Sequence, residues 1–135
     1  MTQLHRFIAA SGLTNLADGI ATLAWAWVAS LLTRDPMLIA SVASALRLPW
    51  FLCAIPAGII TDRADRKRLI LMMDIIRALG FGLAGTALWV ALPLDIAPAY
   101  GVSAPWIFVV LLIAAAIVGT AEVFRDNAAQ TMLPA

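Results

Sequence analysis

Two ionisable residues lie deep inside long apolar runs of this sequence, where a charged side chain is costly and therefore a candidate for proton or ion chemistry. Asp18 lies about eleven residues, or ~16 Å of helix, into the first run, and Arg47 lies at a similar depth in the second. An isolated ion at such a depth in hydrocarbon costs several kcal/mol, so each side chain is expected to face a cavity or a partner. We predict that Asp18 and Arg47 approach each other across the first two helices.

A second set of ionisable residues lies toward one end of the third and fourth apolar runs. Asp74 and Arg77 are three residues apart on one helix face. The same spacing joins Glu122 to Arg125. Interhelical salt bridges and interface anchors are the plainer interpretation of these pairs. The alternative makes Asp18 and Glu122 proton-titrating groups, because a carboxylate closed off from water favours its neutral form and ionises when water reaches it.

Residues 58–68, with the sequence GIITDRADRKR, form a charged segment between the second and third apolar runs. So polar a stretch between two apolar runs is typical of a short loop at a membrane surface. Asp62 is placed to pair with Arg66, one helical turn later, if the second helix continues that far. Asp126 is expected at the same surface, because it lies at the end of the fourth run.

Composition excludes most other classes of protein. The chain is 63% hydrophobic and only 13% charged, with a mean hydropathy of +0.95, whereas soluble domains are about half apolar and a quarter charged. A net charge of +1 does not suggest a nucleic-acid partner. The lone Cys53 can build neither a disulfide framework nor a metal site within the chain. Phosphate-cradling, nucleophile-elbow and zinc-protease motifs are absent from the sequence, so we expect no enzyme, no cofactor and no metal.

Four apolar runs are each long enough to cross a hydrocarbon core of ~30 Å. Residues 33–36 separate the first run from the second, because Pro36 lacks a donor and disfavours helical angles before it. Pro49 and Pro56 predict a kink rather than an end, since neighbouring groups can satisfy the freed carbonyls. No alternating strand pattern is present in the sequence. We predict an all-α, polytopic membrane protein with helices at about 7–32, 37–60, 69–92 and 106–125.

Small residues and basic residues predict how these helices pack and face. Gly80, Gly82, Ala84 and Gly85 in the third run are typical of closely packed membrane helices. The basic residues of the segment 58–68 share one side of the membrane with Arg6, whereas the opposite loops offer only Arg34. By the positive-inside rule the N-terminus and this segment are cytoplasmic, in a multi-pass protein of the inner membrane.

The charged segment also resembles a known family. Its pattern Gly58-x-x-x-Asp62-Arg63-x-x-Arg66-Lys67 is similar to the signature between the second and third helices of the major facilitator superfamily, with one position of slack at the basic end. The segments NLADG (15–19), RLPW (47–50) and AEVFRDNAAQ (121–130) look like a bacterial, efflux-type branch of it. The resemblance implies the first four helices of an N-terminal six-helix half. Because members have twelve spans as a rule, we expect a fragment or truncated gene product of a transporter.

The resemblance implies proton-coupled secondary export of small molecules. Its partners would be a small-molecule substrate, protons, the lipid bilayer and the remainder of the transporter. The charged segment would lock two transporter halves together in the outward-open state, with Gly58 allowing close approach of a helix from the other half. The implied lock residues are Gly58, Asp62, Arg63, Arg66, Lys67 and Asp126, and the candidates for proton coupling or cavity lining are Asp18, Arg47, Glu122 and Arg125.

Three other interpretations stay open. The basic residues of the charged segment could simply anchor to anionic lipid headgroups, at about 1 kcal/mol each. The chain could be a complete four-span small multidrug exporter that acts as a dimer, although such proteins lack a long basic inner loop of this pattern. It could also be a non-transporting membrane protein, such as an assembly partner.

Overall fold

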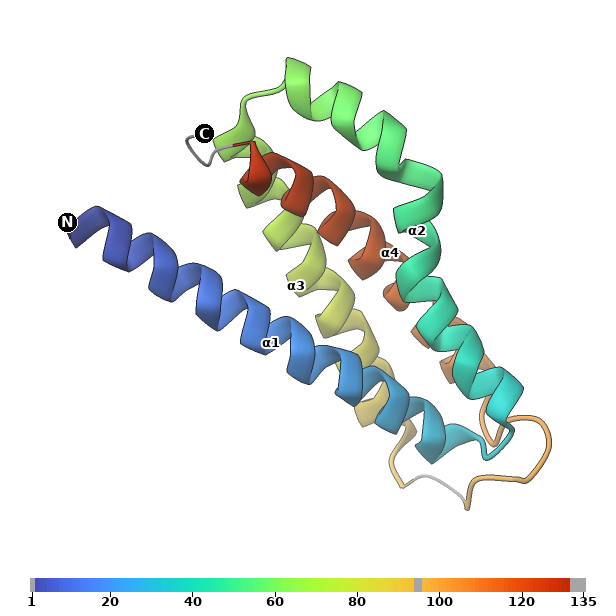
Figure 1. Cartoon of the computed structure of the whole chain (residues 1–135). Helices are drawn as coiled ribbons and strands as arrows, with labels where there is room; N and C mark the ends of the chain where they lie inside the picture. Colours follow the sequence, from blue (N-terminus) through green and yellow to red (C-terminus); the bar gives the residue numbers. More distant parts are fainter. Residues whose placement is uncertain (1, 94–95, 132–135) are drawn as a thin grey trace.

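The computed structural model describes residues 2–93 and 96–131, and every regular element in that part of the chain is an α-helix (Figure 1). Each of its four helices is long and apolar enough to cross a membrane. The predicted all-α class is therefore confirmed, and the helices fit a multi-pass membrane protein. Their bounds are α1 (Thr2–Leu32), α2 (Pro36–Arg63), α3 (Arg66–Ala91) and α4 (Pro105–Gln130).

The turn between α1 and α2 falls where the sequence predicts it. α1 ends at Leu32, and Asp35 caps α2 by accepting a hydrogen bond from the Met37 amide at 3.0 Å. Pro36 then occupies the first helical position, where its missing donor costs nothing. α2 continues through Pro49 and Pro56 without ending, and Figure 1 shows it changing direction along its length.

The predicted loop at residues 58–68 is corrected by the structure, because only Ala64 and Asp65 lie outside the helices. Arginine and lysine form helices readily, so a charged surface segment need not end one. Asp65 starts α3 by accepting from the Lys67 amide at 3.1 Å. Ala64 is extended, which breaks the helical spacing that the predicted pair of Asp62 with Arg66 required.

α4 is the central helix and packs against both α2 and α3. Its inward face is built from small and branched residues that are almost completely buried. Gly119 allows the closest approach, since a Cβ there would lie 2.3 Å from the carbonyl oxygen of Leu46 in α2. A Cβ on Gly80 in α3 would lie 2.7 Å from Cγ2 of Val118. The buried residues on this face are Ile107, Phe108, Leu111, Ala114, Ala115, Val118, Gly119, Ala121, Val123 and Ala128.

The prediction that the small residues of α3 pack closely against another helix is confirmed only in part. Gly80 and Ala84 are buried in α3. Gly82 and Gly85 are exposed, and a Cβ on either would meet no atom within 4 Å.

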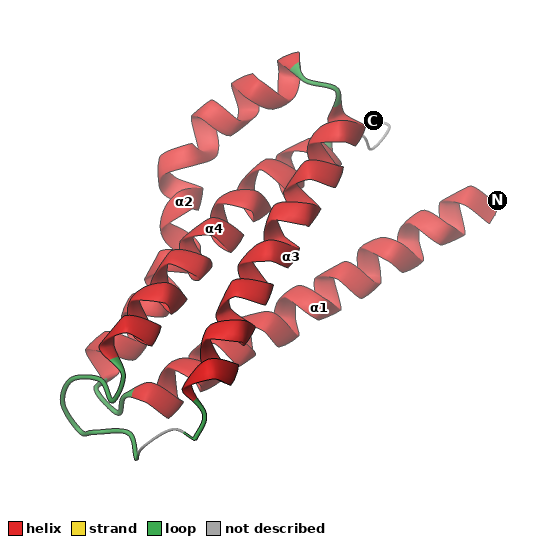
Figure 2. Cartoon of the chain, turned by 180° about the vertical axis from the view of Figure 1, so that it is seen from behind, coloured by secondary structure: helices red, strands yellow, loops and turns green. Residues whose placement is uncertain are grey.

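α1 is attached to the other helices mainly through its second half. Trp25, Ala29 and Leu32 are its buried residues, and the Trp25 ring lies 5.8 Å from the ring of Phe81 in α3. In Figures 1 and 2 the first half of α1 diverges from α3 and α4. We call the end of the molecule that carries the α1–α2 turn and residues 92–93 and 96–104 the loop end. The end that carries the α2–α3 turn is the basic end.

Hydrogen bonds tie the two connections of the loop end together. The Arg34 amide donates to the Pro98 carbonyl at 2.9 Å, and the Ser103 amide donates to the Leu32 carbonyl at 2.9 Å. The Thr33 hydroxyl donates to the Gly101 carbonyl at 2.5 Å. Gly101 has a φ of +75°, a backbone conformation that favours glycine. The loop end is therefore a fixed platform from which the helices extend.

Replacing Thr33 by valine is expected to loosen this platform. Thr33 is fully buried, and its hydroxyl also accepts from the Asp35 amide at 3.1 Å, so the change leaves both partners unpaired. We expect a loss of about 1–3 kcal/mol in the free energy of unfolding, measured in bicelles by tryptophan fluorescence. Thr86→Val is the matched control, because the exposed Thr86 donates only within its own helix. Equal losses in the two variants would contradict the prediction.

Candidate functional site: an intramembrane charged cluster

Arg77 of α3 is the shared partner of carboxylates from three helices. Its Nη2 donates to the Asp18 carboxylate of α1 and lies 3.7 Å from Oε1 of Glu122 in α4. Its Nη1 lies 3.8 Å from Oδ1 of Asp74, one turn earlier in α3, as the spacing of these two residues predicted. The Arg77 side chain is only 12% exposed. Its five donors can serve several carboxylates at once, which a lysine could do less well.

Arg125 of α4 extends the network toward the basic end. Its Nε donates to Oδ1 of Asp74 at 2.6 Å, and its Nη1 lies 3.6 Å from Oδ1 of Asp126. Asp74 therefore bridges the two arginines. We call the six residues together the charged cluster: Asp18, Asp74, Arg77, Glu122, Arg125 and Asp126.

Helix geometry brings these residues to one level. At 1.5 Å per residue, Asp18 lies ~21 Å along α1 from Leu32, and Arg77 lies ~21 Å along α3 from Ala91. Glu122 lies ~26 Å along α4 from Pro105. Because these three reference residues all belong to the loop end, the side chains meet at a similar depth, near the middle of α1 and α3 and nearer the basic end of α4.

The charged cluster holds two more carboxylates than guanidinium groups when all are ionised. Asp18 and Asp74 each accept a hydrogen bond from an arginine, whereas Glu122 and Asp126 have only longer ion-pair contacts, at 3.7 Å to Arg77 and 3.6 Å to Arg125. Arg77 occupies the point where the carboxylates of Asp18, Asp74 and Glu122 converge. Within the described residues, no group of His, Cys, Asp and Glu side chains is arranged to hold a metal ion. The arrangement can hold or release a proton at a carboxylate, and it can link the position of one helix to that protonation.

The predicted pair of Asp18 with Arg47 is not formed. Asp18 contacts Arg77 instead, and Arg47 is exposed on α2, without an ion pair to any residue that the structure describes. The physical reason lies in the packing of α2, which presses its Leu46 carbonyl region against Gly119 of α4. The neighbouring Arg47 is exposed and forms no ion pair with Asp18.

The remaining predicted site residues divide into two groups. Arg125, Asp126 and Glu122 belong to the charged cluster, and Asp126 contacts Arg125 rather than the charged segment. Arg66 donates from Nη1 to the Thr131 carbonyl at 2.7 Å, which ties the start of α3 to the end of α4. No side-chain ion pair among the described residues involves Asp62, Arg63 or Lys67. A Cβ on Gly58 would meet no atom within 4 Å.

Arg77 is the functional candidate that sequence reasoning left out. Its pairing with Asp74 was expected, but its role as partner of Asp18 and Glu122 was not. The available signal was its depth, since it lies as far from the end of its helix as Asp18 does. A deep arginine needs several acceptors, and Asp74 alone is 44% exposed and distant at 3.8 Å.

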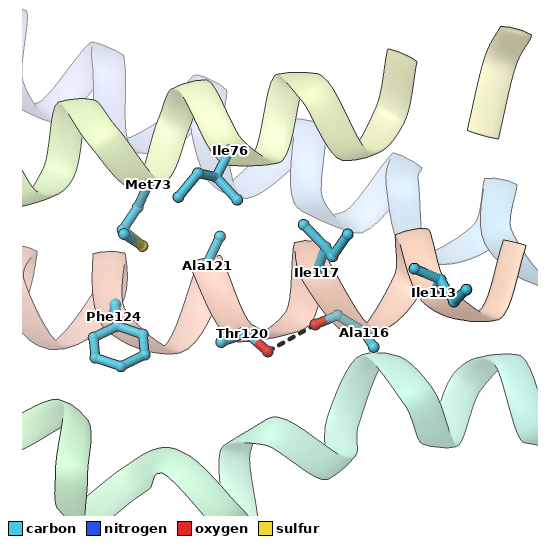
Figure 3. A pocket seen from close by; sticks show the side chains of 8 residues that line it. All are labelled: Met73, Ile76, Ile113, Ala116, Ile117, Thr120, Ala121 and Phe124. Atoms are coloured by element: carbon cyan, nitrogen blue, oxygen red, sulfur yellow. Dashed lines mark hydrogen bonds between the residues drawn. The ribbon is translucent and has the colours of Figure 1, made fainter. Parts of the chain in front are cut away.

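Besides the charged cluster, the molecule has two hollows that are lined mainly by apolar side chains. One, of about 470 Å³, lies between α3 and α4, and Figure 3 shows Met73 and Ile76 of α3 facing side chains of α4. Its only polar side chain is Thr120, whose hydroxyl donates to the Ala116 carbonyl in its own helix. A smaller one, of about 180 Å³, lies beside Trp25 and Phe81. The larger one presents no group that could select a polar ligand, and the smaller one has only the buried indole N–H of Trp25, which has no hydrogen-bond partner among the described residues.

The fold and the charged cluster define a class: a multi-pass helical protein with ion pairs between its helices at membrane depth. Comparisons with known protein families, with curated proteins and with solved structures found no match for this chain. Its function must therefore be argued from its own residues.

Proposed function

We propose that this chain provides membrane helices of a proton-coupled secondary exporter of small molecules, similar to the efflux branch of the major facilitator superfamily. The observation that carries the proposal is the contact of Arg77 with carboxylates from α1, α3 and α4. Ionisable groups at membrane depth are costly, and proton and substrate pathways are where proteins use them. Simple anchoring to lipid would not require a network that joins three helices.

The geometry supports a specific coupling step. Protonation of Asp18 removes the charge that attracts Arg77, and thereby weakens a link between α1 and α3. The second half of α1 is held by Trp25, Ala29 and Leu32, whereas its first half has no buried residue. α4 is fixed between α2 and α3. A proton on Asp18 therefore favours movement of the first half of α1 relative to the other helices.

The distribution of basic residues supports the orientation that belongs to this proposal. The N-terminus, the α2–α3 turn and the end of α4 lie toward one end of the molecule (Figure 1). That end carries Arg6 and the exposed Arg63, Lys67 and Arg68, whereas the loop end carries Arg34. We place the basic end in the cytoplasm and the protein in the inner membrane. The exposed charged segment is then free to contact a further part of the transporter, as a conformational lock requires.

Proton flux driven by an exported compound tests the proposed function. The full chain is reconstituted in vesicles that contain a pH-sensitive dye, and a panel of small organic compounds is added in the presence of a pH gradient. We expect a compound-dependent proton flux that falls at least about tenfold in Asp18→Asn, because the amide cannot exchange a proton.

Asp35→Asn is the matched control for this experiment. It also removes one carboxylate, but asparagine caps a helix as well as aspartate does, and Asp35 lies at the loop end. It should keep the flux of the wild type. Absence of any flux in the wild type, or full proton dependence in Asp18→Asn, would contradict the proposal.

A further inference from the structure

A third hollow differs from the two apolar ones because six of its ten lining residues are polar or charged. It has a volume of about 460 Å³ and lies between the first half of α1 and the basic-end parts of α3 and α4. It also reaches the charged cluster, since Arg125 and Asp126 form part of its wall. We call it the polar cleft, and its polar lining residues are Ser11, Thr14, Asn15, Arg125, Asp126 and Gln130.

The described part of the protein supplies side-chain partners for three of these six residues, Thr14, Arg125 and Asp126, but not for the other three. The Thr14 hydroxyl donates to the Ala10 carbonyl at 2.9 Å. Ser11, Asn15 and Gln130 make no side-chain hydrogen bond to any residue that the structure describes. A carboxamide offers two donors and an acceptor with two lone pairs, and because Asn15 and Gln130 are both exposed, these groups must be satisfied by whatever surrounds the protein at the cleft.

Lipid cannot supply the missing partners at the depth of Asn15. A hydrocarbon core of ~30 Å, counted back from Leu32 along an upright helix, reaches about residue 12. α1 is inclined to its neighbours (Figure 2), and inclination moves that boundary still closer to the N-terminus. Asn15 therefore lies within the hydrocarbon layer. Unsatisfied polar groups there cost several kcal/mol, whereas water in a cavity lined by protein satisfies them.

We infer that the polar cleft holds water and opens at the basic end, so that it connects the charged cluster to the aqueous phase on that side. Asp126 is 37% exposed, whereas Glu122 is 20% exposed, so water from the cleft reaches Asp126 first. Protons suit this route, because the cluster that it reaches holds two more carboxylates than guanidinium groups, although the charged residues of the cleft wall itself, Arg125 and Asp126, balance each other. This inference deepens the proposed function, on which its role as a proton route rests, but hydration of the cleft does not require transport.

Cysteine labelling tests the inference directly. In a Cys53→Ala background, Asn15→Cys is compared with Leu13→Cys, which lies two residues away at nearly the same depth but outside the cleft, with a 69% exposed side chain. A charged, membrane-impermeant maleimide reacts with the thiolate, which forms only in water. Applied from the basic-end side, it should label Asn15→Cys at least about tenfold faster than Leu13→Cys. Thr14→Cys, also in the cleft and inside the same boundary, should behave like Asn15→Cys and guards against a folding defect in one variant.

Each outcome of the labelling decides the inference. Equal and slow labelling of the cleft and control positions would mean that lipid or another helix fills the cleft, and would overturn it. Equal and fast labelling would mean that the whole first half of α1 lies in water, which also overturns it, as would labelling from the loop-end side alone. Selective labelling without any compound-driven proton flux would uphold the water-filled cleft and reject the proposed function.

Discussion

Replacing Arg77 by glutamine is expected to destabilise the folded protein by about 3 kcal/mol, the largest effect of any single charge change in this chain. The substitution removes the cation that Asp18, Asp74 and Glu122 share, and of these carboxylates only Asp74 keeps another guanidinium partner, Arg125. The loss is measured from SDS-driven unfolding in bicelles, followed by tryptophan fluorescence. Arg77→Lys should lose less, because it keeps the charge but not the planar fork of donors.

Arg68→Gln is the matched control for Arg77→Gln. Its side chain is 86% exposed and lies 3.9 Å from Asp65, so the change should cost no more than about 0.5 kcal/mol. A loss for Arg77→Gln as small as that for Arg68→Gln would mean that Arg77 does not hold the helices together.

Replacing Gly119 by alanine is expected to separate α2 from α4. The added Cβ would lie 2.3 Å from the Leu46 carbonyl oxygen and 3.1 Å from its Cα, and a helix backbone cannot move aside as a flexible side chain can. Overpacking usually costs 1–3 kcal/mol, and we expect a value at the upper end, about 3 kcal/mol. Unfolding in bicelles measures the loss in the free energy of unfolding. As a second measurement, two cysteines introduced at the α2–α4 contact should form a disulfide more slowly in the variant than in the wild type.

The control for Gly119→Ala is Gly82→Ala. A Cβ on Gly82 meets nothing within 4 Å, and alanine is the better helix former, so this change should be neutral or slightly stabilising. If Gly119→Ala were equally harmless, the close approach of α2 and α4 described above would be wrong.

Helix ends that carry a chemical stop signal could be predicted from the sequence, and those without one could not. Asp35 and Pro36 supply both a cap and a residue that starts a helix well, and α2 begins there. No stop signal in the sequence indicates that α2 ends at Arg63. Hydropathy locates the membrane boundary, and a helix can continue beyond that boundary. Asp65 is a residue type that commonly caps helices, but the basic residues around it suggested a loop.

The partners of the intramembrane charges could not be predicted because the sequence fixes depth along a helix but not which neighbour lies beside it. Asp18 has a compatible depth with Arg47 and with Arg77. The choice depends on how the helices pack, and Gly119 sets part of that packing by drawing α2 against α4. Ala115 and Gly119, four residues apart, form a pair of small residues that could have marked this contact in advance.

In the structure the partner of Asp18 is Arg77 rather than Arg47, and the charged cluster depends on this contact. A double-mutant cycle on the full chain in bicelles, with Asp18→Asn, Arg77→Gln and the double variant, measures their coupling energy. We predict a coupling of about 1–3 kcal/mol for Asp18 with Arg77 and a value near zero for the matched cycle with Arg47→Gln. A coupling to Arg47 that equals or exceeds the coupling to Arg77 would contradict the charged cluster and the proton-coupling step built on it.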